Sequence, residues 1–167
     1  GVPVVDIWED FQCPVCARFT QTNGDYIEKL IEEKKAKVVF HTLSFLGPES
    51  VLAANAAACS SDENKFLGFH KAFYANLPAE NSGAVTADYL VALGQGVGIT
   101  SDKFKSCVAN LDYNGWVNNV AASGGEANVN STPTVFVNGK EIRRATSGAD
   151  LGDYFDPAAF ARAVEGK

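Results

Sequence analysis

The hydrophobic positions divide the first part of the chain into strand-like and helix-like segments. The run 2–8 is apolar on both faces and predicts a strand buried inside a sheet. The run 37–46 alternates little and predicts a second, central strand. Between them a helix is predicted, with a kink or break at Asn23-Gly24, from apolar residues near helical spacing: Cys16, Phe19, Tyr26, Ile27, Leu30 and Ile31. The β-α-β order implies parallel strands joined by a right-handed crossover.

After Gly47-Pro48 the pattern becomes helical only. Residues 49–60 are rich in alanine, and two short helices are predicted at 86–94 and 101–110, with Thr86 and Ser101 as N-caps. Another helix is predicted within 62–76, where an aromatic stripe favours a buried core over a peptide groove: Phe66, Phe69, Phe73 and Leu77. Residues 47–112 therefore read as an all-helical insertion.

The mixed pattern returns in the last third of the chain. Residues 113–128 are amphipathic, and 132–142 predict a β-hairpin closed by Asn138-Gly139. A final helix is predicted after Asp156 as N-cap, with Pro157 at its first position. The predicted class is α/β, with residues 1–46 and 113–167 forming one domain around the helical insertion.

Composition narrows the classes of function. The chain has 167 residues, of which 46% are hydrophobic, and this suits one domain with a substantial core. No run is long and apolar enough to span a bilayer. The net charge of −6 argues against nucleic acid as a partner, because phosphate binding needs a basic face. The function must therefore be sought in particular side chains.

The clearest candidate chemistry is Cys13-Pro14-Val15-Cys16, at the junction of the first strand and helix. A helix that begins at Cys13 directs unpaired N–H groups and its positive dipole end at that sulfur, which favours the reactive thiolate. Pro14 suits the first helical position. Cys16, one turn later, can attack a mixed disulfide on Cys13. The spacing favours a redox pair over a structural disulfide or half of a metal site.

The other potential ligands are scattered, so no metal site is predicted. His41 and His70 are expected to be packed or hydrogen-bonded side chains. Cys59 and Cys107 are expected to form a structural disulfide, with a second redox relay as the alternative. Such a bridge favours an extracytoplasmic compartment. The chain begins abruptly at Gly1, which we interpret as the start of a mature or trimmed ectodomain.

Three segments carry a resemblance to a known family: Glu9-Asp10-Phe11-Gln12-Cys13-Pro14-Val15-Cys16, Phe69-His70-Lys71-Ala72-Phe73-Tyr74 and Ser131-Thr132-Pro133-Thr134-Val135-Phe136-Val137-Asn138-Gly139. With the order of elements, they resemble the bacterial DsbA-like disulfide oxidoreductases of the thioredoxin family. The resemblance spans the whole chain. It implies a thioredoxin-like fold with a helical insertion.

The resemblance also implies roles. Cys13 is expected to be the exposed nucleophile and Cys16 the buried resolving cysteine. Pro133 is expected to be the family's cis-proline, with Thr132 offering its backbone to an extended substrate. The redox-active Cys13–Cys16 disulfide is expected to be the only cofactor. The expected partners are unfolded or reduced secreted proteins and a membrane reoxidant of the quinone-linked type, with the protein itself a monomer.

The sequence departs from the family pattern at two places. Ile7 occupies the position of the buried acid that often precedes the first cysteine. Glu9 or Asp10 is then a candidate for proton handling, although solvated loop carboxylates are the favoured interpretation of both. Val15 replaces the histidine of the most oxidising relatives, which predicts a less oxidising potential.

The residues around the motif suggest how its surface is formed. Pro14 and Val15 lie between the two cysteines and Phe11 lies two residues before the first, so we expect these three residues to line the motif. We hypothesise that Trp8, Phe11 and part of the helical insertion form an apolar surface near Cys13, suited to unfolded substrates.

These observations predict an extracytoplasmic thiol–disulfide oxidoreductase of the bacterial cell envelope, secreted or membrane-anchored, which introduces disulfides into secreted proteins. The alternative is a redox-sensing or ligand-binding ectodomain of a membrane-anchored protein such as a receptor kinase. Reductase or isomerase activity is possible with the same residues, but isomerases of this broad family generally add a dimerisation module, and none is visible.

Overall fold

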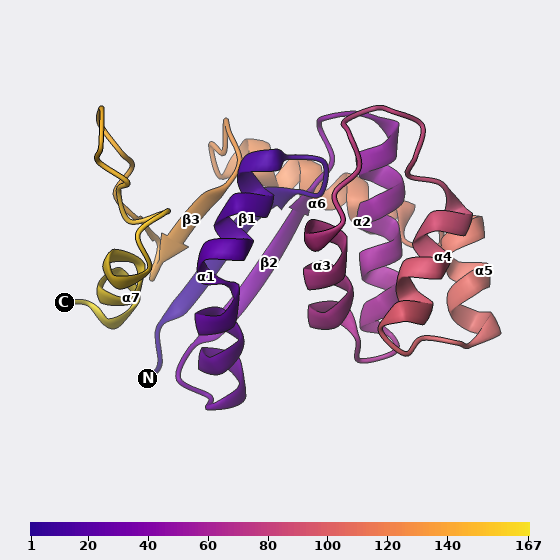
Figure 1. Cartoon of the computed structure of the whole chain (residues 1–167), viewed down its shortest axis with the longest axis horizontal. Helices are drawn as coiled ribbons and strands as arrows, with labels where there is room; N and C mark the ends of the chain where they lie inside the picture. The colour runs from indigo at the N-terminus through magenta and orange to yellow at the C-terminus, as the bar shows by residue number, and fades with distance from the viewer.

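The structure is a computed structural model that describes the whole chain, residues 1–167. Its strands are β1 (Val4–Asp10), β2 (Lys37–Leu43), β3 (Thr134–Val137) and β4 (Lys140–Glu141). Its helices are α1 (Pro14–Glu32), α2 (Pro48–Ser61), α3 (Phe66–Ala75), α4 (Ala87–Gly96), α5 (Asp102–Asn110), α6 (Asn114–Glu126) and α7 (Pro157–Glu165). Figure 1 shows α2 to α5 gathered at one end of the sheet, with α7 and the C-terminus at the other.

The four strands form one sheet in the order β2-β1-β3-β4. The β1–β2 pair is parallel, as the β-α-β pattern predicts, and the β1–β3 and β3–β4 pairs are antiparallel. Asn138 and Gly139 turn between β3 and β4 with φ of 50° and 82°, the positive values that such a hairpin turn requires. The α/β class and the hairpin are therefore confirmed.

The first strand, expected at about residues 2–8, is present and runs over Val4–Asp10, because its pairing with β2 continues to the Asp10–Leu43 pair. The prediction of a central second strand over 37–46 is wrong. The second strand ends at Leu43 and is an edge strand, with β1 taking the central position. Its apolar run reflects cover by α1 and α6, which both contact it, rather than strands on both sides.

The predicted break in the first helix is also wrong, since α1 is continuous from Pro14 to Glu32. The Asn23 side chain is buried, and its Nδ2 donates a hydrogen bond to Tyr154 O at 2.8 Å. An asparagine engaged in this way does not compete for the helix backbone.

The predicted helix starts and ends are largely confirmed. The side chains of Thr86, Ser101 and Asp156 each accept a hydrogen bond from the first turn of the helix they precede. Pro157 occupies the start of α7, as predicted. Between β2 and α6 the chain forms helices only.

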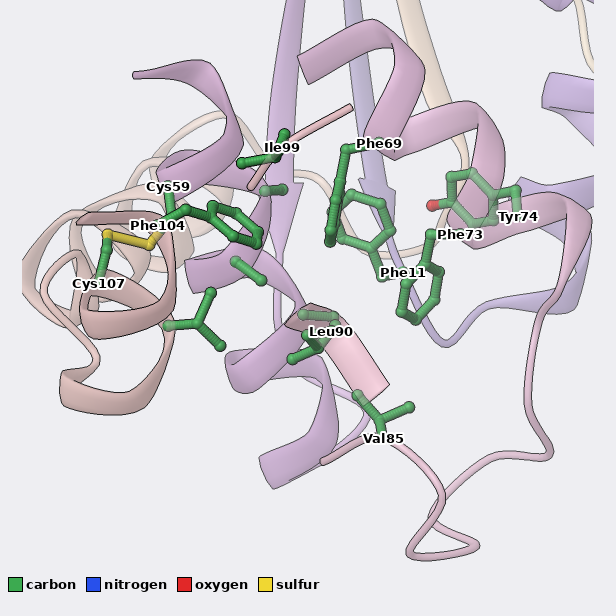
Figure 2. Close-up of a cluster of buried hydrophobic side chains, with 14 of the residues drawn as sticks. Phe11, Cys59, Phe69, Phe73, Tyr74, Val85, Leu90, Ile99, Phe104 and Cys107 are labelled. Atoms are coloured by element: carbon green, nitrogen blue, oxygen red, sulfur yellow. A yellow bond between two sulfur atoms is a disulfide. The ribbon is translucent and has the colours of Figure 1, made fainter. Parts of the chain in front are cut away.

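The hydrophobic residues form two buried clusters, one of which contains both cysteines of the redox motif. One lies under α1 and α7 against the sheet and includes Val5, Ile7 and Phe160. The other joins the helices α2 to α5 to the start of α1. Figure 2 shows part of this second cluster, in which Phe69 and Phe73 lie buried and confirm the aromatic stripe as core.

The second cluster also contains a disulfide. Cys59 of α2 and Cys107 of α5 are joined, with their Cα atoms 5.9 Å apart, and Figure 2 shows the bond beside Phe104. The predicted bridge is therefore present. It closes a loop of 48 residues across the helical segment.

Candidate active site

The redox motif lies at the start of α1. Cys13 is the N-cap, with extended backbone dihedrals, and Pro14 follows at the first helical position. The backbone N–H of Cys16 donates to Cys13 Sγ at 3.4 Å, so this sulfur satisfies a donor that a helix N-terminus leaves free. Both cysteines are free thiols. The start of the helix is the one that the sequence predicts. The expectation of an exposed Cys13 is wrong, because the loop before β3 lies against this residue and leaves only 6% of its surface exposed.

The surroundings of the two sulfurs move their pKa values in opposite directions. A hydrogen bond from the Cys16 side chain, with the N–H groups of Cys16 and Val15, lowers the pKa of Cys13 to about 6, although burial opposes this. Burial raises the pKa of Cys16 far above its ordinary value, assisted by the hydrogen bond to Cys13 and the charge of Glu9. One sulfur is therefore suited to be a thiolate and the other a thiol.

The loop before β3 lies against Cys13. The Thr132–Pro133 peptide bond is cis, as predicted, and Thr132 O lies 3.7 Å from Cys13 Sγ. The N–H of Thr132 makes no hydrogen bond within the chain. A backbone donor and a carbonyl thus stand beside the sulfur, within reach of an extended peptide.

Glu9 is buried on the face of β1 that points toward α1 and α3, with 1% of its surface exposed. Its Oε1 is hydrogen-bonded to His70 Nε2 on α3, and its Oε2 has no partner. Both side chains line a cavity of about 150 Å³ between α1 and α3. Polar side chains, among them Gln21 and Lys71, also line this cavity. The interpretation of Glu9 as a solvated loop carboxylate is wrong.

Asp10 is also buried, and the solvated interpretation is wrong for it as well. Its carboxylate accepts hydrogen bonds from Ser50 Oγ at 2.6 Å, from the N–H of Gln12 at 3.0 Å and from the N–H of Leu46 at 3.1 Å. Burial raises the pKa of Asp10, and these bonds oppose the rise. Because its oxygens are occupied, Asp10 ties the motif loop to the start of α2.

The apolar surface hypothesised from Trp8 and Phe11 does not exist, because both rings are buried. Phe11 is fully buried in the helical cluster, and Trp8 stacks on His41 on the opposite face of the sheet. The exposed apolar side chains near the motif are Val15, at 45% exposure, and Phe45, at 60%. Phe45 lies in the loop after β2, in the same groove as Thr132.

Some contacts of the site escape sequence reasoning. His41 and His70 are hydrogen-bonded, as predicted. Their carboxylate partners, Asp6 and Glu9, lie on β1, which is 35 and 61 residues away in the sequence. Tyr74 Oη donates to Asp10 O at 3.0 Å and so joins α3 to the motif loop. The only sequence signal for these contacts is the position of polar side chains within apolar segments.

No group of three or more His, Cys, Asp or Glu side chains is placed to hold a metal ion. None of the helices combines the length and the apolar character needed to cross a membrane.

The geometry can be compared with that of known proteins. The profile of a family described as "Thioredoxin" matches residues 2–156. "Disulfide bond formation protein D" of Bacillus subtilis (strain 168) is 29% identical over 140 residues, which are 80% of this chain. The match covers 62% of that relative, so the chain spans about three-fifths of its length.

Solved structures agree over nearly the whole chain. DsbA from Mycobacterium tuberculosis, in its reduced form, is 28% identical with a TM-score of 0.80, over 98% of this chain and 81% of that one. The MdbA thiol-disulfide oxidoreductase from Actinomyces oris is 25% identical with a TM-score of 0.81, over 99% of this chain and 81% of that one. The thioredoxin-like fold is therefore confirmed.

Proposed function

Since the chain belongs to the thioredoxin family, among its DsbA-like thiol–disulfide oxidoreductases, we propose that it is a dithiol oxidase that introduces disulfides into secreted proteins. The observation that carries this proposal is the placement of Cys13 at the start of α1, where its Sγ accepts a hydrogen bond from the Cys16 N–H and lies 3.7 Å from Thr132 O, while Cys16 is buried. These surroundings lower the pKa of Cys13 and raise that of Cys16. A sulfur that is stable as a thiolate is a good leaving group, and stabilising the reduced form makes the pair an oxidant.

The reaction starts from the Cys13–Cys16 disulfide. A substrate thiolate attacks Cys13 Sγ, the bond to Cys16 breaks, and a mixed disulfide forms while Cys16 takes up a proton. A second substrate thiolate then attacks the substrate sulfur, and Cys13 leaves as a thiolate. The substrate loses two electrons and becomes a disulfide, and the enzyme pair gains them. No cofactor besides the cysteine pair enters the reaction.

Thr132 and Pro133 form the substrate-docking loop in this proposal. The free N–H of Thr132 pairs with an extended substrate segment, as an added strand does at a sheet edge. Its carbonyl, 3.7 Å from Cys13 Sγ, holds the segment beside the reacting sulfur. Pro133 is buried and keeps this loop against the motif.

Glu9 is the residue that handles the proton of Cys16, rather than Asp10. Its charge already acts on Cys16, and its free Oε2 has no protein partner. The adjoining cavity of about 150 Å³ is large and polar enough for water, which connects the carboxylate to the surface between α1 and α3. The oxygens of Asp10 are occupied by Ser50 and backbone N–H groups.

The setting is an oxidising compartment outside the cytoplasm, at the bacterial cell envelope. The Cys59–Cys107 disulfide supports this placement, because such bonds persist there. Turnover then requires a partner in the membrane that takes two electrons from the reduced pair, such as a quinone-linked protein. The protein acts as a monomer on reduced or unfolded secreted proteins.

The test is catalytic refolding of a reduced protein with several cysteines, with oxidised glutathione to regenerate the enzyme. We expect many turnovers per molecule of protein, all lost in Cys13→Ser. A single stoichiometric exchange would instead support a redox sensor and overturn the proposal. The two directions are also compared at the ratio of reduced to oxidised glutathione found in an oxidising compartment. If the protein reduces substrate disulfides faster than it oxidises substrate thiols there, it is a reductase.

A further inference from the structure

Arg144 follows β4 and lies across the hairpin from the substrate-docking loop of Thr132 and Pro133. The N–H of Ile142 donates to Val135 O at 3.1 Å, so the antiparallel pairing of β3 with β4 continues beyond β4. The same register, carried two residues further, brings Arg144 opposite Pro133. A charged side chain of the hairpin therefore stands beside the loop that lies against Cys13.

The guanidinium of Arg144 hydrogen-bonds this loop at two points. Its Nη2 donates to Pro133 O at 3.2 Å and to Thr134 Oγ1 at 2.9 Å. Thr134 Oγ1 in turn donates to Ser131 O at 2.7 Å. The carbonyls before and after Thr132 are therefore both held, one through Thr134 and the other by Arg144 directly.

Few other contacts hold the loop. The backbone of residues 130–133 makes no hydrogen bond to another backbone group. The remaining partner is the Cys13 thiol, whose Sγ donates to Thr132 O at 3.7 Å. A sulfur in a disulfide has no hydrogen to donate, so this bond is absent when the oxidised protein meets a substrate. Arg144 and Thr134 are then the side chains that hydrogen-bond the loop.

Arg144 is itself fixed, although its side chain is 45% exposed. Its Nε donates to Glu141 Oε1 at 2.6 Å. The same oxygen accepts a hydrogen bond from Tyr154 Oη at 3.1 Å, and the guanidinium carbon lies 4.9 Å from the centre of the Tyr154 ring. Tyr154 is buried, and its Oη accepts the N–H of Val135 in β3. The planar guanidinium therefore links the loop to the hydrophobic cluster under α1 and α7.

We infer that Arg144 is a positioning residue for disulfide exchange, which holds the docking loop so that Thr132 presents its N–H and carbonyl to an extended substrate. The inference rests on the proposed function and concerns the same site. A loop that is already ordered costs less entropy when a peptide pairs with it. Arg144 hydrogen-bonds neither cysteine, so a small dithiol without a peptide backbone gains nothing from it.

The experiment follows a single turnover of the oxidised protein with two substrates, a dithiol peptide and dithiothreitol, which has no peptide backbone. Arg144→Met keeps the apolar part of the side chain and removes its donors. Arg144→Lys keeps the charge but offers one nitrogen where the guanidinium offers three. Arg143→Met is the matched control, because Arg143 bonds Asp150 and not the docking loop.

Arg144→Met should lower the rate constant with the peptide about tenfold, which corresponds to about 1.4 kcal/mol. The rate with dithiothreitol should stay the same, and the thermal midpoint should change little, because an exposed ion pair contributes little stability. Arg144→Lys should lose about threefold with the peptide, and Arg143→Met should lose nothing. The NMR order parameter of the Thr132 N–H should fall in Arg144→Met, from about 0.85 to below about 0.6.

An equal loss with both substrates would assign Arg144 to the sulfur chemistry or to the fold and would overturn the inference. An undiminished peptide rate, or an unchanged order parameter at Thr132, would overturn it as well. The proposed function fails separately, when the unchanged protein reacts once with the peptide and does not turn over. The single-turnover comparison tests Arg144 in either case.

Discussion

The two cysteine pairs of this protein lie in the same buried cluster and have opposite properties. All four sulfurs belong to the hydrophobic group that joins α1 to α2–α5. Cys59, in the last turn of α2, is joined to Cys107 of α5, and the bond lies beside Phe104, as Figure 2 shows. Cys13 instead caps a helix and faces the Thr132 carbonyl. Burial alone therefore does not determine the reactivity of a cysteine. The hydrogen bonds that its sulfur makes also set its pKa, and at Cys13 the bond from the Cys16 side chain contributes most.

The largest expected effect comes from removing the nucleophile of the reactive pair. Cys13→Ser should abolish dithiol oxidation, because no other sulfur can form the mixed disulfide. Cys16→Ser cannot form the Cys13–Cys16 disulfide and should also fail to oxidise dithiols, but its Cys13 thiolate should attack a substrate disulfide and accumulate as a covalent complex, because no resolving thiol is left. Both are read by gel electrophoresis under non-reducing conditions together with refolding assays. Activity retained in Cys13→Ser would mean that the Cys59–Cys107 pair is the redox centre.

Removal of the Cys59–Cys107 pair should lower the stability of the protein and leave its activity unchanged. A Cys59→Ala, Cys107→Ala protein loses the closure of a 48-residue loop, which the chain-entropy model values at about 4 kcal/mol of unfolding free energy. Chemical denaturation measures the loss. Oxidation rates under conditions where the variant is folded should match those of the unchanged protein. A change in rate without a change in stability would contradict a structural role.

The next effect concerns the proton of Cys16. Glu9→Gln removes the charge that raises the pKa of this thiol and also removes the base. We expect reoxidation of the reduced pair by oxidised glutathione, in which Cys16 attacks the disulfide between Cys13 and glutathione, to slow about a hundredfold near neutral pH. The pH dependence of that step should flatten, which a purely structural effect would not cause. Asp6→Asn is the control, since Asp6 lies on the opposite face of the sheet and bonds His41.

The smallest effect concerns the tuning of Cys13. Val15 is 45% exposed and neutral, so it adds no charge-assisted hydrogen bond to the thiolate. Val15→His should raise the reduction potential by about 30 mV, equal to about 1.4 kcal/mol for two electrons. The unchanged protein should have a potential below about −120 mV, the value of the strong oxidant DsbA. Equilibration with glutathione measures the reduction potentials of the unchanged protein and of Val15→His. Equal potentials would exclude a role of residue 15 in setting the potential.

The sequence predicts the parts of the structure that depend on neighbouring residues. The spacing of Cys13 and Cys16, the proline between them and the turn residues Asn138-Gly139 act locally, so they predict the motif, its helix and the hairpin. The position of the Thr132–Pro133 loop beside the motif is implied only by the family resemblance, because it depends on the pairing of β3 with β1, two strands far apart in the sequence. Local pattern could not place it beside Cys13.

The errors have the same origin. The sequence places Glu9 and Asp10 in a solvated loop, because charged side chains are rare inside sheets. In the structure both are buried and hydrogen-bonded, Glu9 to His70 of α3 and Asp10 to Ser50 of α2. The groove beside Thr132 likewise needs α6 and the loop after β2 to meet. Such contacts depend on packing between elements that are distant in sequence, and no periodicity records them.

The central claim is that the surroundings of Cys13 make it a thiolate while Cys16 stays a thiol. The most direct test is the titration of the reduced protein by the ultraviolet absorbance of its thiolates. Because lowering the pKa favours the ionised form, the absorbance should rise once with increasing pH, half-complete near pH 6, and Cys13→Ser should lack this rise. A first transition near pH 8.5, the value of an ordinary cysteine, would contradict the account.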